Sequence, residues 1–128
     1  MAIEEYTKAI QLDPDLPLVY FHRGVSHTRL GETKSPSYGL QDHQNAVADY
    51  DKAIQLDPDY APAYFYRGFS YSERGHYGDA IANYNKAIQL DPDYAVAYFY
   101  LSHHYRFSRP TLTATYEAKA CSLDSQYC

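Results

Sequence analysis

The octapeptide KAIQLDPD occupies Lys8–Asp15, Lys52–Asp59 and Lys86–Asp93 without a single change. Three identical octapeptides in a chain of 128 residues indicate a duplicated structural unit. The last two copies are 34 residues apart, and the match extends to the segments that begin at Ala46 and Ala80. The unit that decides the fold is therefore about 34 residues long.

The residues around the octapeptide predict the end of a helix followed by a corner. Ala80, Tyr84 and Ala87 are spaced at i, i+4 and i+7, which places them on one face of a helix. Pro92 has no amide hydrogen and cannot continue that helix, and an aspartate beside it suits a turn. Small residues on such a face let two helices approach closely, while a large ring fills the space opposite.

A period of 34 residues with this pattern resembles the tetratricopeptide repeat (TPR) family over nearly the whole chain. The residues that carry the resemblance are Tyr64 (where Trp is usual), Gly68, Tyr71, Ala80, Tyr84, Ala87 and Pro92. The resemblance implies an all-α fold, a right-handed solenoid of antiparallel helix pairs with about seven helices. Its parts are expected at 1–16 (a half repeat with only the second helix), 17–60 (first repeat), 61–94 (second repeat) and 95–128 (degenerate third repeat).

The first repeat contains a ten-residue insertion near 32–45. Pro36 and Gly39 favour a loop at its start. We therefore expect the second helix of this repeat to begin around Tyr38 to Asp42. Insertions of this kind usually lie on one rim of a repeat array.

Composition and charge exclude several classes of protein. The formal net charge is -5 and no cluster of Lys and Arg occurs, which argues against nucleic acid as a partner. No apolar run is long enough to cross a membrane, and the N-terminus lacks the layout of a signal peptide, so we expect a cytoplasmic protein. Cys121 takes the place of Ile88 in the repeat, and for Cys121 and Cys128 we favour a buried free thiol over a disulfide or a metal ligand.

In the TPR family the first helices of successive units line the concave face. The resemblance, together with helical spacing, predicts a ligand-binding groove on that face. Its candidate residues are Phe21, Val25, Arg29, Phe65, Phe69, Glu73, Phe99, His103 and Arg106. The groove would hold a peptide or a helix of another protein. The alternative is that the aromatic row is packed between neighbouring helices and belongs to the core.

Other functional patterns are missing from the sequence. The Lys and Asn positions of the carboxylate clamp are Phe21 and Val25, so a chaperone C-terminal carboxylate tail is disfavoured as the partner. No catalytic constellation, Gly-rich phosphate loop or zinc-ligand spacing is recognisable, and we expect no enzyme activity, cofactor or metal.

Two further expectations concern the scaffold. The N-terminal half repeat leaves an apolar stripe incompletely covered, which makes a homo-oligomer, by dimerisation or end-to-end stacking, the alternative function. Arg23 and Arg67 stand where Leu is usual in the first helix of a repeat. We expect each guanidinium to stack on a tyrosine or to meet a carboxylate of the next helix, and Arg67→Leu to be near neutral or stabilising.

Overall fold

The computed structural model describes residues 2–34 and 36–128, and over these residues it is all-helical. Met1 and Ser35, which belong to the predicted half repeat and insertion, lie outside the described residues. The elements are α1 (Ala2–Leu12), α2 (Pro17–Glu32), α3 (Pro36–Leu56), α4 (Ala61–Glu73), α5 (Tyr77–Leu90), α6 (Ala95–Tyr105), α7 (Pro110–Leu123) and the short 3-10 helix η1 (Ser125–Tyr127). The prediction of seven α-helices is confirmed for the described part of the chain.

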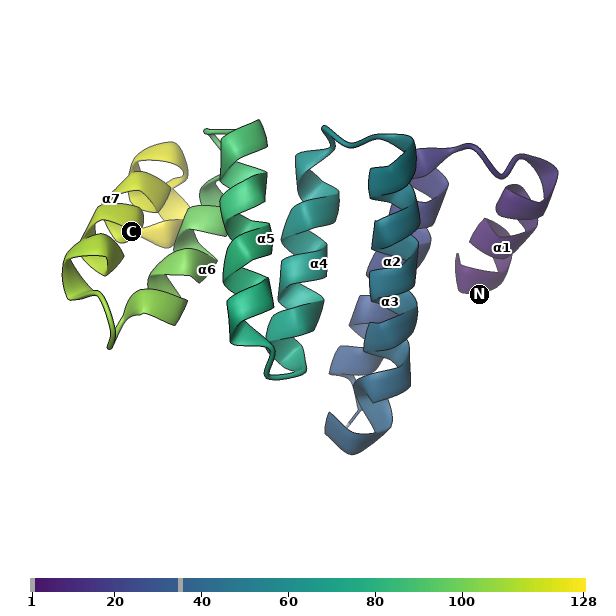
Figure 1. Ribbon diagram of the computed structural model, residues 1–128, viewed down its shortest axis with the longest axis horizontal. Helices are drawn as coiled ribbons and strands as arrows, with labels where there is room; N and C mark the ends of the chain where they lie inside the picture. Colours follow the sequence, from purple (N-terminus) through teal and green to yellow (C-terminus); the bar gives the residue numbers. More distant parts are fainter. Residues whose placement is uncertain (1, 35) are drawn as a thin grey trace.

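The helices stack in chain order, each antiparallel to the next, with the two termini at opposite ends of the array (Figure 1). Every helix packs on its sequence neighbour, and α2 also contacts α4, the first helix of the next repeat. The first helices α2, α4 and α6 therefore run in the same direction and form one layer. This arrangement is the expected solenoid of antiparallel helix pairs.

The repeated octapeptide has the structure that its sequence predicts. Helices α1, α3 and α5 each end at the leucine of the octapeptide. At the second corner the Asp57 carboxylate accepts a hydrogen bond from the backbone N–H of Asp59 at 3.3 Å. The Tyr64 hydroxyl donates to the carbonyl of Pro58 at 3.0 Å, which ties the next helix to the corner. The corner is thus held by its own side chains, because proline removes the backbone donor that would extend the helix.

The insertion departs from expectation. Helix α3 begins at Pro36, before the range Tyr38 to Asp42, and contains Gly39. The prediction of a loop at this point was wrong, because proline is tolerated in the first turn of a helix. The glycine serves a close approach: a Cβ atom on Gly39 would lie 2.5 Å from the carbonyl oxygen of Gly31 in α2. The insertion does not form a separate loop. It lengthens helices α2 and α3, and this pair extends beyond the neighbouring helices (Figure 1).

Each of the first two repeats is fastened by one arginine. Arg23 of α2 makes two hydrogen bonds to the carboxylate of Asp49 in α3, at 2.9 Å and 2.7 Å, and one to the hydroxyl of Thr7 in α1 at 3.2 Å. Its guanidinium lies 5.9 Å from the ring centre of Tyr20. Arg23 therefore joins three consecutive helices, which confirms the scaffold role predicted for it.

The second repeat has a similar arrangement, but the carboxylate that pairs with its arginine lies on a different helix. Arg67 of α4 donates to the side-chain oxygen of Asn83 in α5 at 2.7 Å and to Asp51 in α3 at 2.8 Å. Its guanidinium lies 5.3 Å from the ring centre of Tyr64. The tyrosine contact is as predicted. The carboxylate was expected from the next helix, but α5 supplies the amide of Asn83, and the carboxylate belongs to the preceding helix α3.

Candidate functional site

The middle of the first-helix layer contains a pocket of about 230 Å³, here called the central pocket. All three first helices contribute to it. Its lining residues are Thr28, Arg29 and Glu32 of α2, Phe65, Tyr66 and Phe69 of α4, and Val96 and Tyr100 of α6. Because the first helices of three repeats converge here, the pocket depends on the correct stacking of the whole array.

Perpendicular aromatic rings form the walls of the central pocket. Tyr100 meets Phe65 with ring centres 5.4 Å apart at 68° and Phe69 at 5.7 Å and 88°. Tyr66 meets Phe65 at 5.2 Å and 85°. Such edge-to-face pairs stabilise one another and fix the orientation of each ring. The walls are therefore preformed, and a ligand does not have to order them.

Buried hydroxyl groups form a hydrogen-bond network beside the central pocket. Thr28 is 2% exposed, and its hydroxyl shares hydrogen bonds with the Tyr50 hydroxyl at 2.7 Å and with the Ser70 hydroxyl at 3.1 Å. Burial raises the pKa of Tyr50 far above its usual value. These three residues come from α2, α3 and α4, so the network holds the helices around the pocket in register.

The nine predicted groove residues fall into separate places. Arg29, Phe65 and Phe69 line the central pocket, although Phe65 is only 5% exposed. Phe21 and Val25 are 6% and 9% exposed and belong to the core around Tyr50. Phe21 and Val25, and most of the Phe65 side chain, are therefore packed between helices as part of the core. This is the alternative to a binding groove that the sequence left open.

The remaining four candidates lie outside the central pocket. Glu73 lines a neighbouring pocket of about 200 Å³ that it shares with Glu32 of the central pocket. Phe99, His103 and Arg106 line a third pocket on the last helix pair, here called the end pocket. The structure therefore divides the nine residues among four places and does not join them in one continuous groove.

Sequence reasoning did not include Glu32, Tyr66 or Tyr100 among the site residues. The signal for the two tyrosines was the repeat itself, since both occupy one position on successive first helices. Glu32 gave no comparable signal, because it lies at the start of the insertion near 32–45, where the repeat alignment stops.

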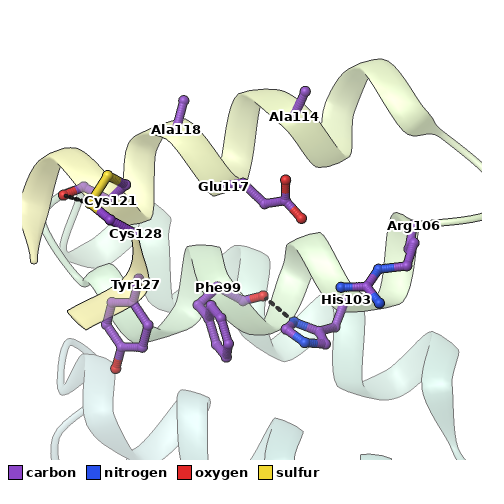
Figure 2. A pocket seen from close by; sticks show the side chains of 9 residues that line it. All are labelled: Phe99, His103, Arg106, Ala114, Glu117, Ala118, Cys121, Tyr127 and Cys128. Carbon is purple, nitrogen blue, oxygen red and sulfur yellow. Dashed lines mark hydrogen bonds between the residues drawn. A yellow bond between two sulfur atoms is a disulfide. The ribbon is translucent and has the colours of Figure 1, made fainter. Parts of the chain in front are cut away.

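The end pocket has a volume of about 550 Å³ and lies between α6, α7 and η1 (Figure 2). His103 is hydrogen-bonded through Nδ1 to the carbonyl of Phe99 at 3.0 Å. Figure 2 shows the Glu117 carboxylate directed towards His103 and Arg106 across the pocket. In the second repeat the equivalent surface is covered by α6, where Tyr100 packs on Phe65. The end pocket is thus the counterpart of a seam between two repeats.

A disulfide closes one side of the end pocket. Cys121 and Cys128 are bonded, with their Cα atoms 4.6 Å apart (Figure 2). The prediction of a free thiol was wrong, because position 121 lies at the end of α7, where η1 folds back and brings Cys128 against it. The fold-back also packs Tyr127 on Phe99, with ring centres 4.8 Å apart.

We predict that the Cys121→Ser, Cys128→Ser double variant is less stable than the native chain by about 2 kcal/mol, because the bond restricts the unfolded chain over a short loop. Thermal melts with and without dithiothreitol measure the effect. The native chain should lose stability on reduction, while the double variant should not respond. Detection of two reactive thiols in the unreduced, denatured protein would contradict the disulfide.

In residues 2–34 and 36–128 no group of three or more His, Cys, Asp or Glu side chains is placed to hold a metal ion. No helix in this part of the chain combines the length and the apolar character needed to span a bilayer.

Comparisons with solved structures agree with the fold. The structure of YrrB, described as a TPR protein with an unusual peptide-binding site, superposes with a TM-score of 0.80 and 24% identity, covering 96% of this chain and 59% of that one. TTC0263, a thermophilic TPR protein of Thermus thermophilus, gives a TM-score of 0.83 with 21% identity, covering 98% of this chain and 69% of that one. MamA of Desulfovibrio magneticus gives 0.77 with 18% identity, over 97% and 65%.

At these identities the likeness concerns the fold, and the chain spans 59% of the length of YrrB. No curated protein matches the sequence. The family model described as TPR repeat matches residues 1–31, 38–75 and 70–105, which together make up most of the chain. The chain therefore belongs to the tetratricopeptide repeat family.

Proposed function

We propose that this chain is a non-catalytic module that binds an extended or helical segment of another protein on its concave face, with the central pocket as the main anchor site. TPR proteins are generally protein-interaction modules, and a protein with the same fold, YrrB, has a peptide-binding site. The observation that carries the proposal is the aromatic central pocket, to which three repeats contribute.

The physical basis is a preformed site. Rigid aromatic anchors cost little conformational entropy on binding, and aromatic residues are enriched among the residues that dominate interface energies. Phe69 and Tyr66 are half-buried, so each still offers surface to a ligand. Phe21, by contrast, is packed in the core.

The test is selection of a random linear peptide library on the purified chain, beside the variant Phe69→Ala. We expect peptides with a common motif to be enriched by the native chain and to lose most of their affinity for the variant, because Phe69 forms one wall of the pocket. Phe107→Ala is the matched control, since Phe107 is 94% exposed and lies outside the pocket. Thermal melts establish that both variants are folded. Enrichment that survives Phe69→Ala would place binding elsewhere.

A second candidate is self-assembly through the N-terminal half repeat. A pocket of about 250 Å³ lies between α1 and α2, and its lining is almost entirely apolar. Its residues include Ile3 and Leu30, and Leu30 is 38% exposed. Self-assembly through this surface would give a mass that rises with concentration and falls for Ile3→Asp. A mass that stays monomeric from micromolar to near-millimolar concentration would exclude it.

We also propose a cytoplasmic location and a scaffolding role. The disulfide counts against this location, because reducing compartments keep most thiols free. In the cytoplasm the bond between Cys121 and Cys128 would therefore depend on the local redox state.

A further inference from the structure

We infer that the central pocket receives a basic side chain, lysine or arginine, from the bound segment. This inference rests on the proposed function, and it adds the chemical class of the anchor residue.

The aromatic walls suit a long cationic side chain. Tyr66, Phe69 and Tyr100 meet Phe65 or one another at steep angles, so the rings enclose the space as the sides of a box. The electron-rich face of an aromatic ring attracts an ammonium or guanidinium group. The methylene stem of lysine or arginine can pack on the same rings while its charged end reaches further.

Carboxylates lie where that charged end would arrive. Glu32 lines both the central pocket and the adjoining pocket, and Glu73 lines the adjoining pocket one helical turn after Phe69. Burial raises the pKa of Tyr100, and the negative charges of Glu32 and Glu73 raise it further.

The helix termini add to the negative potential. Glu32 is the last residue of α2 and Glu73 is the last residue of α4. Because these helices run in the same direction, the negative ends of both helix dipoles lie at the same end of the concave layer. A cation is favoured near the C-terminus of a helix.

Lys34 and Arg74 line the adjoining pocket together with these carboxylates. Lys34 forms an ion pair with Asp42 at 2.6 Å, and the Arg74 guanidinium lies 6.0 Å from the ring centre of Tyr71. Within residues 2–34 and 36–128, Glu32 and Glu73 have no ion-pair partner within 4.0 Å. A large apolar anchor would take water from Glu32 without replacing its hydrogen bonds, which is unfavourable.

Arg29 is the cation on the wall of the central pocket, and it opposes a basic ligand. The sign of the anchor's charge can therefore be tested, because removing a negative and a positive charge from the pocket should change the affinity in opposite directions. Removal of a carboxylate should weaken binding, and removal of the Arg29 charge should strengthen it. An acidic anchor predicts the reverse for both changes.

The experiment selects the random linear peptide library in parallel on the native chain, on Glu32→Gln/Glu73→Gln, on Arg29→Gln and on the control Glu4→Gln, which lies outside the pockets described above. All four positions are exposed, so the fold should be unaffected, and thermal melts establish this. The most enriched peptide is then synthesised with its basic residue intact and with norleucine in its place, and the Kd of each is measured by calorimetry.

We expect one position of the selected peptides to be lysine or arginine. The double glutamine variant should bind the basic peptide about tenfold more weakly and the norleucine peptide unchanged. Arg29→Gln should bind the basic peptide more tightly, and Glu4→Gln should behave as the native chain.

Two results would overturn the inference, and they are distinguishable. Enriched peptides without a basic position, or a Kd unaffected by the double variant, would refute the basic anchor while leaving peptide binding intact. A complete lack of enrichment by the native chain would refute peptide binding and the basic anchor together.

Discussion

Replacement of Arg23 by methionine should lower the free energy of unfolding by about 3 kcal/mol at pH 7, because it leaves the buried carboxylate of Asp49 without its partner. The side chain of Asp49 is 6% exposed, and Arg23 supplies two of its hydrogen bonds. His27 does not replace that cation. Its Nε2 is 3.9 Å from the carboxylate, too far for a hydrogen bond, and burial lowers its pKa.

The second repeat provides the matched control. Arg67→Met removes the same side chain from the same place in the repeat, but the buried partner is the neutral amide of Asn83. Its other partner, Asp51, has a side chain that is 55% exposed and returns to water. We expect a loss of about 1 kcal/mol, the usual cost of one unpaired buried acceptor. The near-neutral effect that the sequence suggested for Arg67→Leu is therefore revised, because Arg67 donates a hydrogen bond to the side-chain oxygen of Asn83.

Urea denaturation of both single variants measures the difference. Arg23→Met combined with Asp49→Asn should recover part of the loss, because the double variant contains no unpaired buried charge. Equal losses for Arg23→Met and Arg67→Met would contradict this explanation, since they would show that the charge of Asp49 does not matter.

The third repeat shows how an array manages without such an arginine. Leu101 occupies the position of Arg67 and is completely buried, and Tyr116 packs against the core there. The same place between two helices is therefore filled by a charged pair, an amide pair or an apolar pair in three successive repeats. A charged pair contributes little over an apolar pair, but it is costly to break.

The parts of the fold that repeat could be predicted from the sequence. The three identical octapeptides predicted the ends of α1, α3 and α5 and the corners that follow them. Where the repeat stops, prediction failed. Helix α3 starts at Pro36 because Gly39 allows contact with α2, and a contact between two helices leaves no local signal.

The candidate site was harder to predict than the fold. Helical spacing assigns a residue to a face, but it does not say how deeply the next repeat covers that residue. Phe21, Phe65 and Phe99 hold equivalent positions. Phe21 and Phe65 are covered by Tyr66 and Tyr100 of the next repeat, whereas Phe99 lines the open end pocket. The disulfide was missed for a similar reason, since η1 has no counterpart in the other repeats.

Replacement of Gly24 by alanine should destabilise the protein by about 3 kcal/mol, at the upper end of the range for overpacking. A Cβ atom at this position would lie 2.6 Å from Cε1 of Tyr50. That ring cannot yield, because Tyr50 is completely buried, packs against Phe21, and is held through its hydroxyl by Thr28 at 2.7 Å. The gain in helix propensity from glycine to alanine, about 1 kcal/mol, offsets only part of the clash.

Gly68 is the equivalent residue of the second repeat, and it separates the effect of the clash from that of helix propensity. Its added Cβ would be 3.0 Å from the ring of Tyr84, so a smaller shift relieves the contact and we expect Gly68→Ala to cost about 1 kcal/mol or less. Urea denaturation compares the two variants, and in a Tyr50→Leu background the cost of Gly24→Ala should largely disappear. If Gly24→Ala and Gly68→Ala cost the same in the native background, the close approach of α2 to Tyr50 does not limit this position. If only Gly24→Ala is costly, the contact between Gly24 and Tyr50 is the tighter of the two. Tyr50 belongs to the hydroxyl network beside the central pocket. The same variant should therefore also weaken the proposed peptide binding.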